Sequence, residues 1–158
     1  MKIKLIVSGK PGDDMYKSGI AEYEARIKRY IPFETIRIPG IKNPGKLSIP
    51  ELKRIESGKI ADLFSSSDLV ILLDEKGKEM SSSGFAKFLN HLFHTASSKT
   101  LVFAIGGAYG FDDLIRTKAG YILSLSQMTY PHQMIRLFFL EQLYRSFTII
   151  NHESYHHD

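Results

Sequence analysis

The chain has 158 residues, a formal net charge of +4 at pH 7 and no cysteine. This length suits one domain with a real hydrophobic core, and the lack of cysteine excludes disulfides and thiolate ligands. The apolar residues 3–7 are too few for a signal peptide core or a membrane span, so we expect a cytoplasmic protein without membrane contact. The basic charge is typical of proteins with a polyanionic partner such as a nucleic acid.

The first half of the chain alternates between patterns typical of strands and of helices. Strands are expected at residues 3–8, 33–38 and 68–73. The third is a continuous apolar run, as in a parallel sheet that is buried on both faces. Helices are expected at residues 13–31 and 51–64, and the Pro- and Gly-rich residues 41–50 predict a loop.

The second half continues the alternation. The serines at 81–83 can cap a helix whose apolar residues follow helical spacing: Phe85, Phe88, Leu89, Leu92 and Phe93. Strands are expected at 100–105 and 121–126, a short helix at 112–118 and a long helix after Pro131. The repeated alternation predicts an α/β fold with a mostly parallel sheet, and residues 1–158 are expected to form a single domain.

Ligands in open parallel sheets bind beyond the carboxyl ends of the strands, and three such ends stand out here. They are residues 73–77, residues 106–110 and residues 125–130. The glycines of the second end permit close approach to the backbone, but the GGxxG spacing is not the GxGxxG of dinucleotide-binding folds. One such loop can be only a tight turn, whereas three that converge favour a ligand site.

The final helix has no single polar face. At 100° per residue, His132 and Arg136 point to one side, while Glu141 and Arg145 lie roughly opposite. A surface helix would show one solvated stripe, so this helix should be covered on most sides, with its polar groups paired internally or held in a site or interface. Glu141 and Arg145 have the spacing of an ordinary i,i+4 ion pair. His132 sits where a histidine can hold a proton or cap the helix.

Several motifs occur together along the chain. They are KLIVSGK at residues 4–10, GIAEYEARI at 19–27, LLDEKGKEMSS at 72–82, FAIGGAYG at 103–110, LSLSQMTYPHQMIRL at 123–137, EQLYRSF at 141–147 and SYHH at 154–157. In this combination the chain resembles the RlmH family, small methyltransferases of the SPOUT superfamily, over nearly its full length. Residues 41–59 match none of these motifs.

The resemblance implies a SPOUT fold with a C-terminal trefoil knot, S-adenosylmethionine as methyl donor and a homodimer with the cofactor in the knot. It implies methylation of N3 of a pseudouridine in large-subunit (23S) ribosomal RNA, on the assembled ribosome. Carried over by position, the cofactor residues are Leu73, Gly106, Leu125, Ser126, Gln127, Met128, Thr129 and Tyr130. The catalytic and RNA-facing candidates are His132, Glu141, Arg145, Tyr155 and His156.

The implied reaction must remove a weakly acidic N3–H as the methyl group arrives, so a base or a nearby cation would help. His132 and His156 are both candidates for the base, and Arg136 and Arg145 for the cation. We expect the C-terminal tail to order over the cofactor pocket when RNA binds. No metal is expected, because the terminal histidines lack a supporting framework. Two alternatives stay open: a nucleotide-dependent oxidoreductase and a basic, non-catalytic RNA-binding module.

Overall fold

The computed structural model describes residues 1–9 and 14–157. Its five strands form one sheet in the order β2-β1-β4-β3-β5, in which every neighbouring pair is parallel. The strands are β1 (Lys2–Ser8), β2 (Phe33–Ile38), β3 (Asp68–Glu79), β4 (Thr100–Ile105) and β5 (Tyr121–Ser124). The expected α/β fold with a parallel sheet is therefore confirmed.

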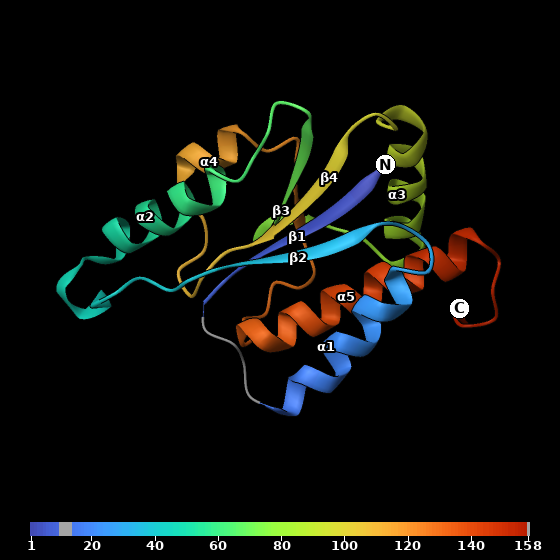
Figure 1. Ribbon diagram of the computed structural model, residues 1–158, viewed down its shortest axis with the longest axis horizontal. Coiled ribbons are helices and arrows are strands. Elements are labelled where there is room, and N and C mark those ends of the chain that lie inside the picture. The colour runs from blue at the N-terminus through green and yellow to red at the C-terminus, as the bar shows by residue number, and fades with distance from the viewer. Residues whose placement is uncertain (10–13, 158) are drawn as a thin grey trace.

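Helices cover both faces of this sheet (Figure 1). They are α1 (Asp14–Ile27), α2 (Ile49–Ala61), α3 (Ser82–Thr95), α4 (Asp113–Thr117) and α5 (His132–Ile150), with a short 3-10 turn at Pro44–Lys46. α1, α3 and α5 pack on one face, and α2 and α4 pack on the other. Among the described residues, no helix is both long enough and apolar enough to cross a bilayer.

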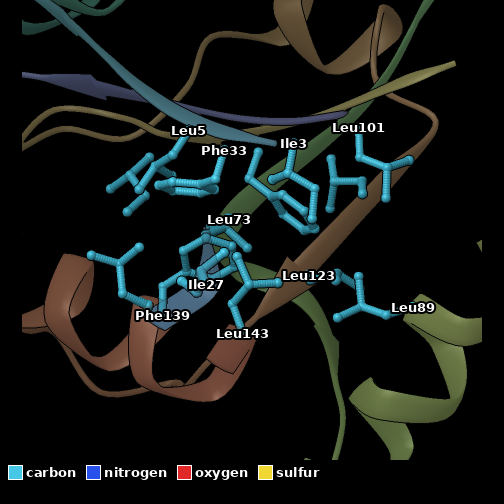
Figure 2. Close-up of a cluster of buried hydrophobic side chains, with 14 of the residues drawn as sticks. Ile3, Leu5, Ile27, Phe33, Leu73, Leu89, Leu101, Leu123, Phe139 and Leu143 are labelled. Carbon is cyan, nitrogen blue, oxygen red and sulfur yellow. The ribbon is translucent and has the colours of Figure 1, made fainter. Parts of the chain in front are cut away.

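Alternation along the strands divides the buried side chains between these two faces. Leu5 of β1 belongs to the cluster under α1, α3 and α5, whereas its neighbour Ile6 belongs to the cluster under α2 and α4. Figure 2 shows the first cluster, in which Phe139 and Leu143 of α5 face the side chains of the sheet. Burying a side chain of this size contributes about 1.5–3 kcal/mol, so this cluster holds α5 firmly against the strands.

Local capping explains where several helices begin. α2 starts at Ile49, two residues before the predicted start, because Ser48 and Glu51 form a reciprocal capping box and Pro50 fits the first turn. The hydroxyl of Ser81 accepts a hydrogen bond from the backbone N–H of Gly84 and caps α3. The Asp112 carboxylate caps the short α4 in the same way.

Other predicted boundaries were wrong by a few residues. α1 ends at Ile27 and not at residue 31, because the Tyr30 N–H bonds back to Ile27 in a tight turn before Pro32. The predicted start at residue 13 lies outside the described residues. α2 ends at residue 61 rather than 64, and β5 ends at residue 124 rather than 126.

The largest difference is the length of β3, which continues six residues beyond the predicted end at Leu73. Leu123 of β5 pairs with Leu73 and, after a break in register, also with Lys78. The two chains approach closely at Gly77, where an added Cβ would lie 2.7 Å from the amide nitrogen of Leu123. β3 therefore contacts β5 on both sides of this break. The trefoil knot itself stays an implication of the resemblance.

Candidate functional site

The carboxyl ends of three strands line one cleft of about 660 Å³. Its walls come from the residues that follow Leu73 in β3, from the β4–α4 loop and from the β5–α5 loop. β4 lies next to β3, and β3 lies next to β5, so the order of the strands brings these ends together. The expected convergence of the three strand ends is present, and the volume lies within the range of small-molecule pockets.

Seven of the eight expected cofactor residues line this cleft. They are Leu73, Gly106, Leu125, Ser126, Met128, Thr129 and Tyr130. Gln127 lies in the same loop and is exposed, but it is not among the lining residues. The Ser126 hydroxyl accepts a hydrogen bond from the Met128 N–H, which gives the loop a compact turn.

The glycine loop after β4 is tightly folded. The Gly110 N–H bonds to the Gly107 carbonyl over 3.0 Å, and Gly110 has a φ of 75°. A Cβ added at Gly106 would come within 3.2 Å of the Phe111 ring. Glycine is therefore required at Gly110 by its backbone conformation and favoured at Gly106 by close packing.

An ion pair fixes the rim of the cleft between β3 and α4. Nη2 of Arg116 lies 2.7 Å from Oδ2 of Asp74, whose side chain is only 6% exposed. Oδ1 of the same carboxylate accepts a hydrogen bond from the Lys76 N–H. Both partners line the cleft, yet sequence reasoning assigned neither of them a role. Asp74 followed a strand, but nothing in the local pattern pointed to Arg116.

A second hollow of about 370 Å³ is lined by residues of β3, α3, β5, the β5–α5 loop and α5. It shares five residues with the cleft: Leu73, Leu125, Ser126, Tyr130 and Ile135. The buried Ser124 hydroxyl lines it and has no hydrogen-bond partner among the described residues. The two hollows are therefore adjacent, and the unpartnered Ser124 hydroxyl marks the second one as polar on one wall.

His132 is the catalytic candidate that reaches the cleft. It is the first residue of α5, and its Nδ1 is buried without a hydrogen-bond partner among the described residues. Burial lowers the pKa of His132, and the nearby Glu56 carboxylate opposes this by favouring the protonated form. The net effect is a neutral imidazole at neutral pH, which is the state that accepts a proton.

The other four catalytic candidates form a cluster at the far end of α5. Nε of Arg145 donates to Oε1 of Glu141 over 2.9 Å, which confirms the expected i,i+4 ion pair. The Tyr155 hydroxyl donates to the same oxygen over 3.2 Å, and Nη1 of Arg145 lies 3.1 Å from Nδ1 of His156. Burial raises the pKa of Tyr155, and so do its contacts with the Tyr23 hydroxyl and the Glu141 carboxylate. The cluster is thus a connected polar network.

The C-terminal tail contains neither helix nor strand, but it is packed against α1 and α5. The Tyr155 ring meets the Tyr144 ring at 4.8 Å between centroids, and its hydroxyl lies 3.2 Å from that of Tyr23. The Tyr30 hydroxyl donates to the Glu153 carboxylate over 2.7 Å. In this chain these contacts hold the tail against α1 and α5. The expectation that the tail orders over the cofactor pocket when RNA binds stays a prediction.

The candidates therefore divide into two groups along one helix. His132 and Arg145 are thirteen positions apart in α5, which corresponds to about 20 Å along the helix axis. Figure 1 shows α5 running from the carboxyl ends of the strands to the C-terminal tail. The cleft lies at those strand ends. In one chain, a single substrate base cannot meet both groups.

Arg136 follows His132 by one turn but belongs to neither group. Its guanidinium pairs with the Glu24 carboxylate of α1 over 2.8 Å, and the Thr35 hydroxyl donates to the same carboxylate. It is buried, and it is not among the residues that line the cleft. Arg136 therefore ties α5 to α1 in this structure.

Phe138 is the exposed residue of α5, and the rest of the helix is buried or half-buried, so the expected lack of a solvated face is confirmed. No group of three histidine or acidic side chains with the geometry of a metal site occurs within residues 1–9 and 14–157.

The chain matches the family model described as "Predicted SPOUT methyltransferase" over residues 1–156. Three similar proteins are named ribosomal RNA large subunit methyltransferase H. That of Parabacteroides distasonis is 47% identical over the full length of both chains. Those of Flavobacterium johnsoniae and Cytophaga hutchinsonii are 48% and 46% identical, over 99% of this chain and at least 99% of theirs. These relatives do not favour the oxidoreductase alternative, and the chain belongs to the SPOUT methyltransferase family.

Proposed function

We propose that this protein transfers a methyl group from S-adenosylmethionine to N3 of a pseudouridine in large-subunit ribosomal RNA. The observation that carries the proposal is the single cleft formed by the ends of β3, β4 and β5. The names of the relatives support ribosomal RNA as the substrate. We further propose that the protein acts in the cytoplasm, on assembled ribosomes.

The residues of the cleft fit this cofactor. Apolar side chains such as Leu73 and Leu125 suit an adenine ring, and the backbone of the β5–α5 loop offers polar groups for its edge. Charged side chains of both signs suit the zwitterionic methionine part: Lys53, Asp74, Glu75, Lys76 and Arg116. When bound, the cofactor supplies a methyl group that is already activated by a sulfonium, so no metal is needed. The whole set of cofactor residues expected from the sequence remains our proposal.

The chain itself must handle the proton of the substrate nitrogen. His132 is the base that this cleft favours, because it lines the cleft and burial keeps it neutral. His156 is held by Arg145 at the other end of α5. We therefore assign His132 to the proton and the cluster of Glu141, Arg145, Tyr155 and His156 to contact with RNA.

A homodimer would reunite the two groups of candidates. Because they lie about 20 Å apart along α5, both can serve one RNA site only if a second copy of the chain brings its cluster to the cleft. The apolar surface beside the cleft supports such a contact: Phe138 is 42% exposed and stacks edge-on against Tyr130, and Met128 is 71% exposed. We propose that a second copy covers this surface.

Mixing two inactive variants tests the dimer. We expect His132→Gln and a chain lacking residues 154–158 to be inactive separately. Equal amounts mixed under dissociating conditions and recombined at random should recover about one quarter of the wild-type activity, because about half of the dimers are mixed and each mixed dimer has one complete site. A monomer in analytical ultracentrifugation would overturn the dimer. A dimer without recovery would show that each chain uses its own tail. Loss of cofactor affinity in the truncated chain would contradict a role confined to RNA.

Methyl transfer from tritiated S-adenosylmethionine tests the activity. We expect label in the large-subunit RNA of ribosomes from cells that lack this gene, less label in free RNA, and one added methyl group on a pseudouridine by mass mapping. Gly106→Ala should weaken cofactor binding, because the added Cβ would press on the Phe111 ring. Gly40→Ala is the control, because a Cβ added at Gly40 has no neighbour within 4 Å. RNA binding without methyl transfer would favour the non-catalytic module. Stabilisation by NAD but not by S-adenosylmethionine would favour an oxidoreductase.

A further inference from the structure

Glu56 of α2 is a carboxylate beside the cleft to which neither motif nor spacing drew attention. It lies one turn after Lys53, which lines the cleft, and it rests on the glycine loop. A methyl group added at Gly107 would collide with both carboxylate oxygens of Glu56. The absence of a side chain at Gly107 therefore lets this carboxylate approach the loop backbone.

Glu56 and His132 are chemically complementary, because a carboxylate can accept a hydrogen bond from an imidazole N–H. Nδ1 of His132 is buried and unpaired within the described part of the chain. Glu56 is the charged neighbour that favours the protonated form of His132. Leaving a buried nitrogen without a partner is unfavourable, which indicates that Nδ1 gains a partner in another state.

The other charged groups of the cleft are less suited to pair with this histidine. They are Lys53 of α2, Asp74, Glu75 and Lys76 of β3, and Arg116 of α4, with the phenols of Tyr109 and Tyr130 from the loops. Asp74 is already paired with Arg116. Of the acidic groups, only Glu56 contributes to the pKa of His132.

We propose that Glu56 is a positioning residue that pairs with Nδ1 of His132 when the cleft is occupied by its ligands. This inference rests on the proposed methyl transfer. The N3–H bond of the substrate breaks, its proton passes to Nε2 of His132, and the electron pair left on N3 forms the new bond to the methyl carbon. The electrons of the old methyl bond return to the donor sulfur, and Glu56 stabilises the imidazolium that results.

Glu56→Gln tests this role, because it keeps the shape of the side chain and removes the charge. We expect kcat to fall by about 10- to 100-fold while the Kd of S-adenosylmethionine changes less than about twofold. The base must be neutral, so the acid limb of the kcat profile follows the pKa of His132. Removing the carboxylate lowers this pKa, and the limb should move to lower pH.

Two further variants separate positioning from folding. Glu56→Asp keeps the charge, so its kcat should lie between those of Glu56→Gln and the wild type. The acid limb of its kcat profile should lie close to that of the wild type. Asp62→Asn, at the exposed C-cap of α2, removes the same charge away from the cleft and should change neither. A Glu56→Gln enzyme with normal kcat and an unmoved limb would overturn the proposal. So would loss of cofactor affinity with kcat intact, which would make Glu56 a cofactor ligand.

Nuclear magnetic resonance titration of His132 gives a readout that does not need activity. In the protein without ligands, the pKa of His132 should be lower in Glu56→Gln than in the wild type and unchanged in Asp62→Asn. An equal pKa of His132 in all three proteins would overturn the proposal that Glu56 pairs with His132. Failure of the wild type to methylate ribosomes would instead refute the proposed function and leave this comparison intact.

Discussion

Arg116 of α4 and Asp74 of β3 join two segments 42 residues apart through an ion pair of 2.7 Å at the rim of the cleft. The Asp74 carboxylate also fixes the turn after Leu73 by accepting the Lys76 N–H. The pair thus holds two of the three strand ends in place, and it is more enclosed than an ordinary surface ion pair because the two side chains are 6% and 22% exposed.

We expect Arg116→Ala to lower the free energy of unfolding by about 1–3 kcal/mol, because it leaves the enclosed Asp74 carboxylate without its cation. Urea denaturation measures this change. Asp74→Asn in the same background should cost less than the sum of the two single variants, since the remaining partner is no longer an unpaired charge. Additive losses would show that the two side chains do not stabilise each other.

Gly77→Ala should be among the most damaging single substitutions in this chain. Its Cβ would lie 2.7 Å from backbone atoms of Ile122 and Leu123, which cannot move without breaking the β3–β5 pairing. We expect a loss of more than about 4 kcal/mol, or no folded protein, by urea denaturation and circular dichroism.

Gly58→Ala is the matched control for that substitution. Gly58 lies inside α2, and an added Cβ meets nothing within 4 Å. Alanine favours the helix and restricts the unfolded chain, so we expect an increase in stability of about 0.5–1 kcal/mol. If both variants lost similar stability, the contact between β3 and β5 would not be the cause.

His132 should make the stability of the protein fall at acidic pH. Its pKa is lowered in the folded state, mainly by burial, so the unfolded chain binds this proton at higher pH than the native protein does. Stability is therefore lost as the pH falls below the ordinary histidine value of about 6.5. Urea denaturation between about pH 7 and pH 5 should show a shallower decline for His132→Gln. Parallel curves would mean that His132 has the same pKa in both states.

Tyr30 should make the stability of the folded protein fall as the pH rises in the alkaline range. Burial and the hydrogen bond to Glu153 raise its pKa to about 12, from an ordinary value near 10. The fold favours the neutral phenol, so this contribution is complete below about pH 10 and is lost as the pH rises through about 12. Tyr30→Phe should lack it in denaturation curves. Glu153→Gln should lower the pKa of the Tyr30 phenol, which an alkaline titration followed by ultraviolet absorbance measures. An unchanged titration would show that the Glu153 carboxylate does not contact Tyr30.

Local pattern was sufficient for most of the sheet. The strands at residues 33–38 and 100–105 were predicted with their observed bounds. Each is rich in residues that favour strands, and each stops at a turn residue, Pro39 or Gly106. The helix of Phe85 to Phe93 was equally clear from its spacing. The end of β3 was missed because residues 74–79 are mostly charged or glycine, and they become strand only by pairing with β5.

The sequence by itself determined the family, the parallel α/β fold and the three loops that end the strands, because these depend on residue types and spacings within short stretches of chain. Only the tertiary structure decided which side chains share a site. It placed His132 at the cleft and Arg145 about 20 Å away on the same helix, and it brought Glu56 to Gly107 and Asp74 to Arg116. Such contacts join residues far apart in the chain, and they are fixed by how strands and helices pack rather than by any local pattern.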